Sequence, residues 1–247
     1  MDYDLALKKP FTSFKKLIIG ILLSILPIVR WFAFGYILEC SALGRNKTNN
    51  LPEWTNWKEL FVKGFLATVI QLIYYIPAII VLLIFGATAL FALIKTLLTT
   101  ELWQAVISGA SEETIQSLIQ PNLPLLTPYI VALAPFLVIA GILGLLAKYI
   151  TPIAVLNYVK NNKFEYGFKG IVFKKAFTGK YFLAWLIIVV ISLVISSILG
   201  YAIIIGPAIA FFIMGVFSYT LFGQVYLELE ENLKVKEKTV KKVIKRK

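Results

Sequence analysis

The sequence has no histidine and only one cysteine, Cys40. Histidine is the commonest general base and the commonest zinc ligand, so its absence removes many familiar catalytic and metal-binding arrangements. One cysteine cannot form a disulfide within the chain, and Cys40 is most simply interpreted as a small buried apolar residue. We find no Gly-rich phosphate loop and no nucleophile beside a base. The sequence therefore predicts no catalytic site, no metal site and no cofactor.

Charge is also scarce: 15% of the 247 residues are charged and 59% are hydrophobic, whereas soluble domains average about 25% charged residues. A bilayer-spanning helix needs about 20 apolar residues. The long apolar segments are residues 17–43, 65–94, 127–147, 183–205 and 207–229. We expect an all-α integral membrane protein, with about four full crossings, an N-terminal re-entrant or short helical hairpin, and two cytoplasmic interfacial amphipathic helices.

The net charge of +12 follows the apolar pattern and does not indicate nucleic-acid binding. Lysine and arginine concentrate in residues 1–16, 44–64, 160–182 and 232–247, whereas residues 96–126 have neither and carry three glutamates. By the positive-inside rule, the first four segments are cytoplasmic and only the last is outside. We expect a multi-pass protein of the cell membrane with both termini in the cytoplasm.

The first apolar segment, residues 17–43, fits a single crossing poorly. One straight helix over this segment would be about 40 Å long, too long for the bilayer core, yet two crossings need more residues. Pro27 lies near its middle, shortly before Arg30. We favour two short helices that enter the membrane and return. The alternative is one tilted crossing, which would place ten basic residues of segments 44–64 and 160–182 outside.

The stretch "NNLPEWTNWKELFVKG", residues 49–64, predicts a short amphipathic helix. Asn50 and Glu53 fit an N-cap with its reciprocal acid, and Pro52 suits a first turn. At helical spacing, the aromatic residues of one face are Trp54, Trp57, Phe61 and Phe65. Aromatic residues of this kind favour the membrane interface.

The segment 160–182 is interpreted as a counterpart of this helix. Phe164 and Phe168 begin its apolar face, and Trp185 marks the return to the membrane. All these aromatic residues are expected to be interfacial anchors. Alternatively, the two helices form a cytoplasmic platform for a partner or for lipid headgroups.

The sequence "GYILECSALGRNKTNNLPEWTNWKELFVKGF" resembles the signature of a family of archaeal and bacterial membrane proteins, domain of unknown function 4013. The similar features are Gly35 and Tyr36, the Leu-Pro-Glu-Trp box at 51–54, then Trp57 and Gly64 before the next span. The resemblance implies a helical membrane fold and brings no established activity.

Ionisable and polar groups within the spans are the candidates for function, because charge is costly at membrane depth. The candidate intramembrane polar residues are Arg30, Glu39, Gln71, Tyr74, Tyr75 and Lys148. Arg30 binds an anionic substrate, pairs with Glu39 or another helix, or anchors at the interface. The polar patch from Gln71 to Tyr75 lines a cavity or bonds a neighbouring helix. Lys148 marks the inner interface.

The C-terminal segment, residues 232–247, is expected to be a basic cytoplasmic tail following a single transmembrane domain, residues 1–231. Its candidate lipid-headgroup contacts are Lys241, Lys242, Lys245, Arg246 and Lys247. Each charge adds about 1 kcal/mol of attraction to an anionic leaflet. The alternative is a topology determinant with a disordered end.

The sequence leaves three functional hypotheses. The first is a non-enzymatic scaffold, accessory subunit or membrane-organising component, whose partners are the bilayer, anionic lipid headgroups and another membrane protein or a second copy of the chain. The alternative is a transporter or channel for a small solute, such as an anion attracted to Arg30. A membrane enzyme is the third and has the least support, because no clustered acids or nucleophiles are present.

Overall fold

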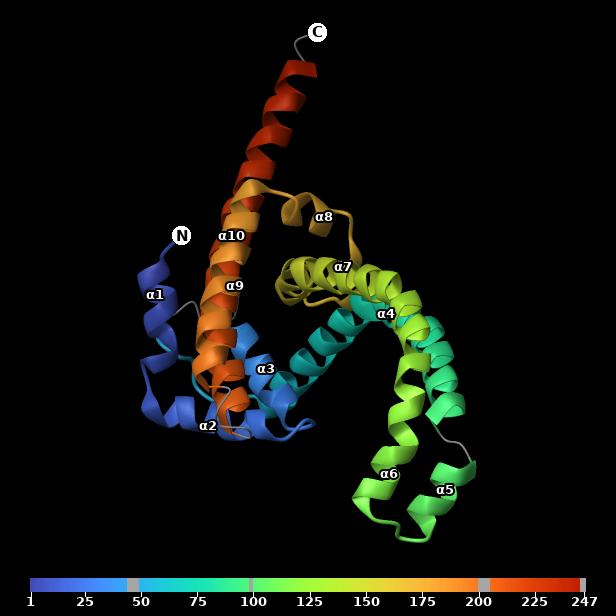
Figure 1. Ribbon diagram of the computed structural model, residues 1–247. Coiled ribbons are helices and arrows are strands. Elements are labelled where there is room, and N and C mark those ends of the chain that lie inside the picture. Colours follow the sequence, from blue (N-terminus) through green and yellow to red (C-terminus); the bar gives the residue numbers. More distant parts are fainter. Residues whose placement is uncertain (44–48, 98–99, 200–204, 245–247) are drawn as a thin grey trace. The chain divides into compact units, whose positions relative to one another are not determined.

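The computed structural model describes residues 1–43, 49–97, 100–199 and 205–244, which are almost entirely helical and include no strand (Figure 1). The elements are α1 (Tyr3–Lys8), η1 (Lys9–Phe11), α2 (Phe14–Ile25), α3 (Arg30–Glu39), α4 (Trp57–Leu97), α5 (Thr100–Ile107), α6 (Glu112–Ile119), η2 (Gln120–Asn122), α7 (Leu123–Asn161), η3 (Phe164–Phe168), α8 (Ile171–Ala176), α9 (Gly179–Leu199) and α10 (Ile205–Ile244). The expected all-α class is confirmed.

Four of the described helices, α4, α7, α9 and α10, are long and apolar enough to cross a membrane, which makes the chain a multi-pass membrane protein. The apolar windows of α4, α7 and α9 are only 11% buried, whereas that of α10 is 61% buried. The first three helices therefore leave apolar surface for lipid. Most of the apolar window of α10 is covered by protein.

The first apolar segment divides into α2 and α3, both too short to cross a bilayer. The break follows from Pro27, because a proline disfavours helical backbone at the preceding residue. Leu26 is accordingly extended, with φ −93° and ψ 130°. The two helices contact each other, so the segment is a pair of short helices and not one tilted helix. Its entry into the membrane stays a prediction.

Two helix boundaries differ from those expected. The helix predicted to begin near Asn50 begins at Trp57, as the first turn of α4, and Asn56 before it has a positive φ of 55°. Asparagine tolerates this left-handed backbone better than most residues. The counterpart in segment 160–182 consists of the short pieces η3 and α8, so neither stretch forms the separate amphipathic helix that we expected.

The last apolar segment also begins differently. Gly206 and Pro207 lie in the first turn of α10, where proline is well tolerated, and do not form the turn itself. The connection, residues 200–204, lies outside the described residues. α10 then continues to Ile244, so most of the expected tail is helical. The boundary at residue 231 stays a prediction.

The structure divides into two compact units, residues 1–72 with 148–247 and residues 73–147. In the first unit, α10 packs against α9, α2, α3 and α1. Its largest fully buried side chains include Tyr36, Tyr181, Phe212, Phe217 and Tyr226. The amino group of Met1 lies 3.1 Å from Glu228 Oε1, which ties the start of the chain to α10.

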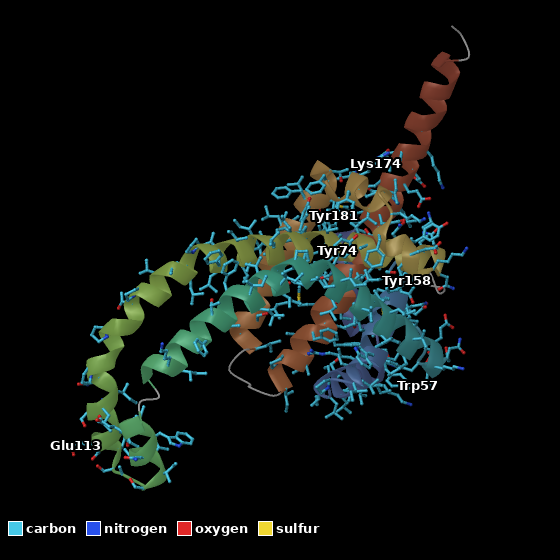
Figure 2. The ribbon with its side chains drawn as sticks, turned by 90° about the vertical axis from the view of Figure 1, so that its right-hand side faces the viewer. Trp57, Tyr74, Glu113, Tyr158, Lys174 and Tyr181 are labelled. Carbon is cyan, nitrogen blue, oxygen red and sulfur yellow. The ribbon has the colours of Figure 1, made fainter. Side chains whose placement is uncertain are left out.

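The second unit contains the remaining turns of α4 and α7 together with α5, η2 and α6. The rings of Phe85 on α4 and Phe136 on α7 stack with centroids 3.4 Å apart. α5 and α6 lie side by side (Figure 1). Ser111 caps α6, and the following turn carries Glu112 and Glu113, the latter labelled in Figure 2. Acidic residues suit the positive end of a helix dipole.

Candidate functional site

The Leu-Pro-Glu-Trp box, residues 51–54, lies in the first unit and is held in an irregular conformation by hydrogen bonds from distant residues. The backbone N–H of Leu51 donates to Thr12 Oγ1 at 3.0 Å, and Lys16 Nζ donates to the Leu51 carbonyl at 2.9 Å. The Tyr36 hydroxyl donates to the Pro52 carbonyl at 2.6 Å. These partners replace the intrahelical bonds that a helix starting near Asn50 would have made.

Lys16 connects the rest of the box. Its ammonium lies 2.6 Å from Glu53 Oε1, and its backbone carbonyl accepts a 3.3 Å hydrogen bond from the Trp54 indole. The Trp54 ring stacks on Tyr36 with centroids 3.7 Å apart and an interplanar angle of 7°. The ring centroid of Tyr36 in turn lies 6.0 Å from that of Phe212 on α10. The box therefore joins the residue after η1, Thr12, to α2, α3 and the aromatic core around α10.

Gly35 and Gly64, two other residues of the family signature, mark a close crossing of α3 and α4. A Cβ at Gly35 would lie 1.9 Å from the carbonyl oxygen of Leu60. A Cβ at Gly64 would lie 1.9 Å from the carbonyl oxygen of Trp31. Small residues allow helix backbones to approach this closely, which is a common device in membrane proteins. Glycine is therefore required here for packing.

A buried ion pair lies beside this crossing. Lys63 donates to Glu39, and its ammonium is also 3.6 Å from Glu59. Lys63 is 5% exposed and Glu39 9% exposed. A cavity of about 260 Å³ lies next to the pair and is lined by Glu39, Glu53 and Glu59 among others. Lys63 pairs with Glu39 and Glu59, and Lys16 pairs with Glu53. Because all three acids have a lysine partner, we interpret the arrangement as a structural network of ion pairs.

Within the first unit, Arg30, Glu39 and Gln71 have different partners. Arg30 and Glu39 lie at opposite ends of α3, so the pairing considered between them does not occur. The Arg30 guanidinium lies 4.2 Å from the Phe211 ring centroid. Its Nε is buried and has no acceptor among the residues that the structure describes. Gln71 Nε2 donates to the Tyr219 hydroxyl at 3.4 Å.

The other polar candidates are spread along α4 and α7. Tyr74 and Tyr75 belong to the second unit, where Tyr75 Cε1 lies 4.0 Å from the position that a Cβ on Gly144 would take. Lys148 is exposed and takes part in none of the ion pairs between described residues. Its expected place at the inner interface stays a prediction.

The predicted interfacial anchors all have aromatic neighbours. Trp57 is 44% exposed, and its ring centroid lies 5.5 Å from that of Trp54. The ring centroids of Phe61 and Phe32 are 5.0 Å apart. The same distance is 5.4 Å between Phe164 and Phe168 and 5.3 Å between Trp185 and Tyr149. Their role as anchors stays a prediction.

The predicted headgroup contacts lie at the end of α10 and beyond it. Lys241 and Lys242 belong to α10, whereas Lys245, Arg246 and Lys247 lie outside the described residues.

Sequence reasoning missed a cluster where α7, α8 and α10 meet. We name it the lysine pocket: a cavity of about 280 Å³ whose charged and aromatic lining includes Lys160, Lys169, Lys175, Lys234, Tyr226 and Glu230. α8 also carries Lys174, labelled in Figure 2. The signal available in the sequence was the spacing of Tyr226, Glu230 and Lys234, which places three polar groups on one face of α10.

The pocket is built on a hydrogen-bonded scaffold. The Tyr226 hydroxyl donates to Asn157 Oδ1, and Asn157 Nδ2 donates to the Tyr166 carbonyl at 2.6 Å. Asn157 and Tyr226 are both buried. This chain of bonds fixes the Tyr226 ring against α7 and η3.

Comparisons with known proteins agree with the resemblance of the box and its surroundings. The model of the family described as "Protein of unknown function (DUF4013)" matches residues 18–205, a range that runs from α2 to the start of α10. Neither a curated protein nor a solved structure matches the chain. The matched range includes the box and the Gly35 and Gly64 crossing. The chain therefore belongs to the DUF4013 family of proteins of unknown function.

Proposed function

We propose that the protein is a non-enzymatic component of the cell membrane that acts as a scaffold, accessory subunit or membrane-organising element. One observation carries the proposal: within the first unit, the candidate polar residues contact different protein groups. Arg30 lies on Phe211, Glu39 pairs with Lys63, and Gln71 bonds Tyr219. A solute pathway would instead need these groups to converge on a common water-filled space.

The arrangement of apolar surface supports the same proposal. α4, α7 and α9 leave most of their apolar windows uncovered. These faces suit acyl chains, another membrane protein or a second copy of the chain. In the proposed topology both termini are cytoplasmic, and the basic end of α10 lies near anionic headgroups.

A transporter of a small anion is the second candidate, and one observation favours it. Arg30 Nε is buried with no acceptor among the described residues, as expected for a group that awaits an anionic ligand. The two functions differ in whether water reaches Arg30.

Thiol labelling distinguishes them. Cys40 is replaced by serine, and single cysteines are introduced one at a time in the otherwise cysteine-free chain. The test positions are Leu26, Arg30, Gln71 and Tyr75, with topology controls at Ser111 and Asn162. Intact cells and inverted vesicles are then treated with a membrane-impermeant thiol reagent.

The proposed topology predicts that Ser111 reacts only from outside and Asn162 only from inside. The scaffold proposal predicts that cysteines at Arg30 and Gln71 react from neither side. Reaction at both positions would contradict it and favour transport, which solute flux in proteoliposomes would then test.

A further inference from the structure

The lysine pocket holds more positive charge than its surroundings balance. Four lysines and one glutamate line it among the described residues, a formal charge of +3. Glu230 is the shared partner of three of them: it accepts from Lys160, lies 2.9 Å from Lys234 and lies 3.9 Å from Lys175. One carboxylate cannot neutralise three ammonium groups. The Lys234 side chain is exposed to water, whereas Lys175 is buried, and unbalanced charge is costly when it is withdrawn from water.

Lys175 is the most constrained of these groups, because it is only 2% exposed. Its ammonium lies 3.3 Å from the Tyr226 ring centroid, a cation–π contact that uses the ring held by Asn157. Its distance to Glu230 is too long for a hydrogen bond. Among the described residues, Arg30 Nε is the buried side-chain polar atom without a hydrogen-bond partner, so the Lys175 ammonium is not a buried, unpaired donor. Lys175 lines the pocket, where an anion would meet its ammonium group.

We propose that the lysine pocket binds a phosphate-bearing anion, with Lys175 at its base and Lys160, Lys169 and Lys234 around its opening. A phosphate group supplies several acceptor oxygens, and lysine binds it well as a point charge. A cavity of about 280 Å³ is near the lower limit of ligand pockets, which suits a headgroup or a small phosphate. This site is independent of the proposed function.

A second cavity adjoins the lysine pocket. It has a volume of about 330 Å³ and shares Lys175 and Leu233 with the lysine pocket. Its lining is mixed: Leu229, Leu233 and Val235 are apolar, whereas Lys174, Lys175, Thr178 and Asn232 are polar. A basic pocket beside a cavity with an apolar part is the arrangement that an anionic lipid requires. A soluble phosphate would use the basic pocket alone.

The acid–base properties of Lys175 support the site. The groups around its ammonium are Lys174 on its own helix, Lys160 and Asn157 on α7, Tyr166 on η3, Lys169, and Tyr226, Glu230 and Lys234 on α10. Burial, followed by repulsion from Lys160 and Lys234, lowers the pKa of Lys175 to about 7. An anion in the pocket favours the charged form of Lys175. The affinity of the pocket for the anion is therefore expected to fall as the pH rises above 7, because Lys175 then loses its charge.

The test uses the full chain in detergent, with two probes. The first is phosphatidylglycerol compared with zwitterionic phosphatidylcholine, counted by native mass spectrometry. The second is inorganic phosphate, measured by calorimetry at fixed ionic strength. The variants are Lys175→Met and, as a matched control, Lys163→Met, which removes an exposed lysine that does not line the pocket. Lys234→Gln serves as a second pocket variant, and melting curves establish that each variant is folded.

Loss of one charge-assisted contact is expected to weaken binding about tenfold in Lys175→Met and less than about twofold in Lys163→Met. Lys234→Gln should also weaken it. Selective phosphatidylglycerol binding without phosphate binding assigns a lipid headgroup, whereas phosphate binding assigns the phosphate group alone. Equal losses in Lys175→Met and Lys163→Met would overturn the proposal, because they indicate general surface attraction. Failure of both probes to bind would overturn it as well.

Discussion

The substitution Gly64→Ala tests the close crossing of α3 and α4 most directly. The added Cβ would lie 1.9 Å from the Trp31 carbonyl oxygen and 2.8 Å from the Gly35 nitrogen. A normal van der Waals contact is about 3.5 Å, and both atoms belong to backbone that no rotamer change can move aside. The helices must separate by about 1 Å or more.

The magnitude follows from two opposing effects. Overpacking costs about 1–3 kcal/mol, and contact with backbone places this site at the upper end. Alanine recovers about 1 kcal/mol of helix propensity. A net loss of about 2 kcal/mol corresponds to a fall in Tm of about 4–8 °C for a chain of this size.

Gly86→Ala is the matched control, because Gly86 lies on the same helix. Among the described residues, no atom outside its own stretch of helix lies within 4 Å of the position of its Cβ. This variant should keep or raise the Tm, by about 2–4 °C at most. Both are measured on the full chain in one detergent by the change in helical circular dichroism on heating. Equal shifts in the two variants would refute the packing argument.

Three further predictions concern the same unit. Lys63→Met should lower the free energy of unfolding by about 3–5 kcal/mol, because the Glu39 carboxylate stays buried without its lysine. Adding Glu39→Gln to this variant should recover most of the loss in Tm. A double variant with no higher Tm than Lys63→Met would contradict this explanation. Tyr36→Phe should cost about 1–2 kcal/mol by removing the hydrogen bond to the Pro52 carbonyl, so an unchanged Tm would argue against that bond. The pKa of Lys175 is lowered to about 7 from 10.5, so the unfolded chain binds more protons between these values and stability should rise with pH across this window. Lys175→Met should flatten that rise in a pH series of melting curves, and a parallel profile would rule out this lysine as its source.

The membrane helices were predictable because they depend on continuous apolar runs. The break between α2 and α3 was also predictable, since Pro27 acts on its neighbours within the same segment. These features need only local information. The absence of histidine and the single cysteine are read directly from the amino-acid composition.

The start of α4 shows where local information fails. Asn50, Pro52 and Glu53 have the spacing of a helix N-terminus, but Tyr36 and Lys16 bond the Pro52 and Leu51 carbonyls instead. These partners are distant in sequence, and no spacing rule reveals them. Tertiary contacts outweigh a cap worth about 1 kcal/mol.

The candidate site was hidden for the same reason. Glu39 pairs with Lys63 of another helix and not with Arg30 of its own apolar segment. The lysine pocket combines residues of α7, α8 and α10, and Lys175 resembles an ordinary surface lysine in the sequence. Only the fold shows that it is buried.

The central place of α10 has a consequence for the order of biosynthesis. A chain is synthesised from its N-terminus, so α2, α3 and α4 are made before the last described helix. Arg30 contacts Phe211, the Tyr36 ring lies near the Phe212 ring, and the amino group of Met1 pairs with Glu228. Phe211, Phe212 and Glu228 all belong to α10. The first unit therefore cannot complete its core until α10 has been synthesised. Until then the early helices depend on lipid or on the insertion machinery for cover.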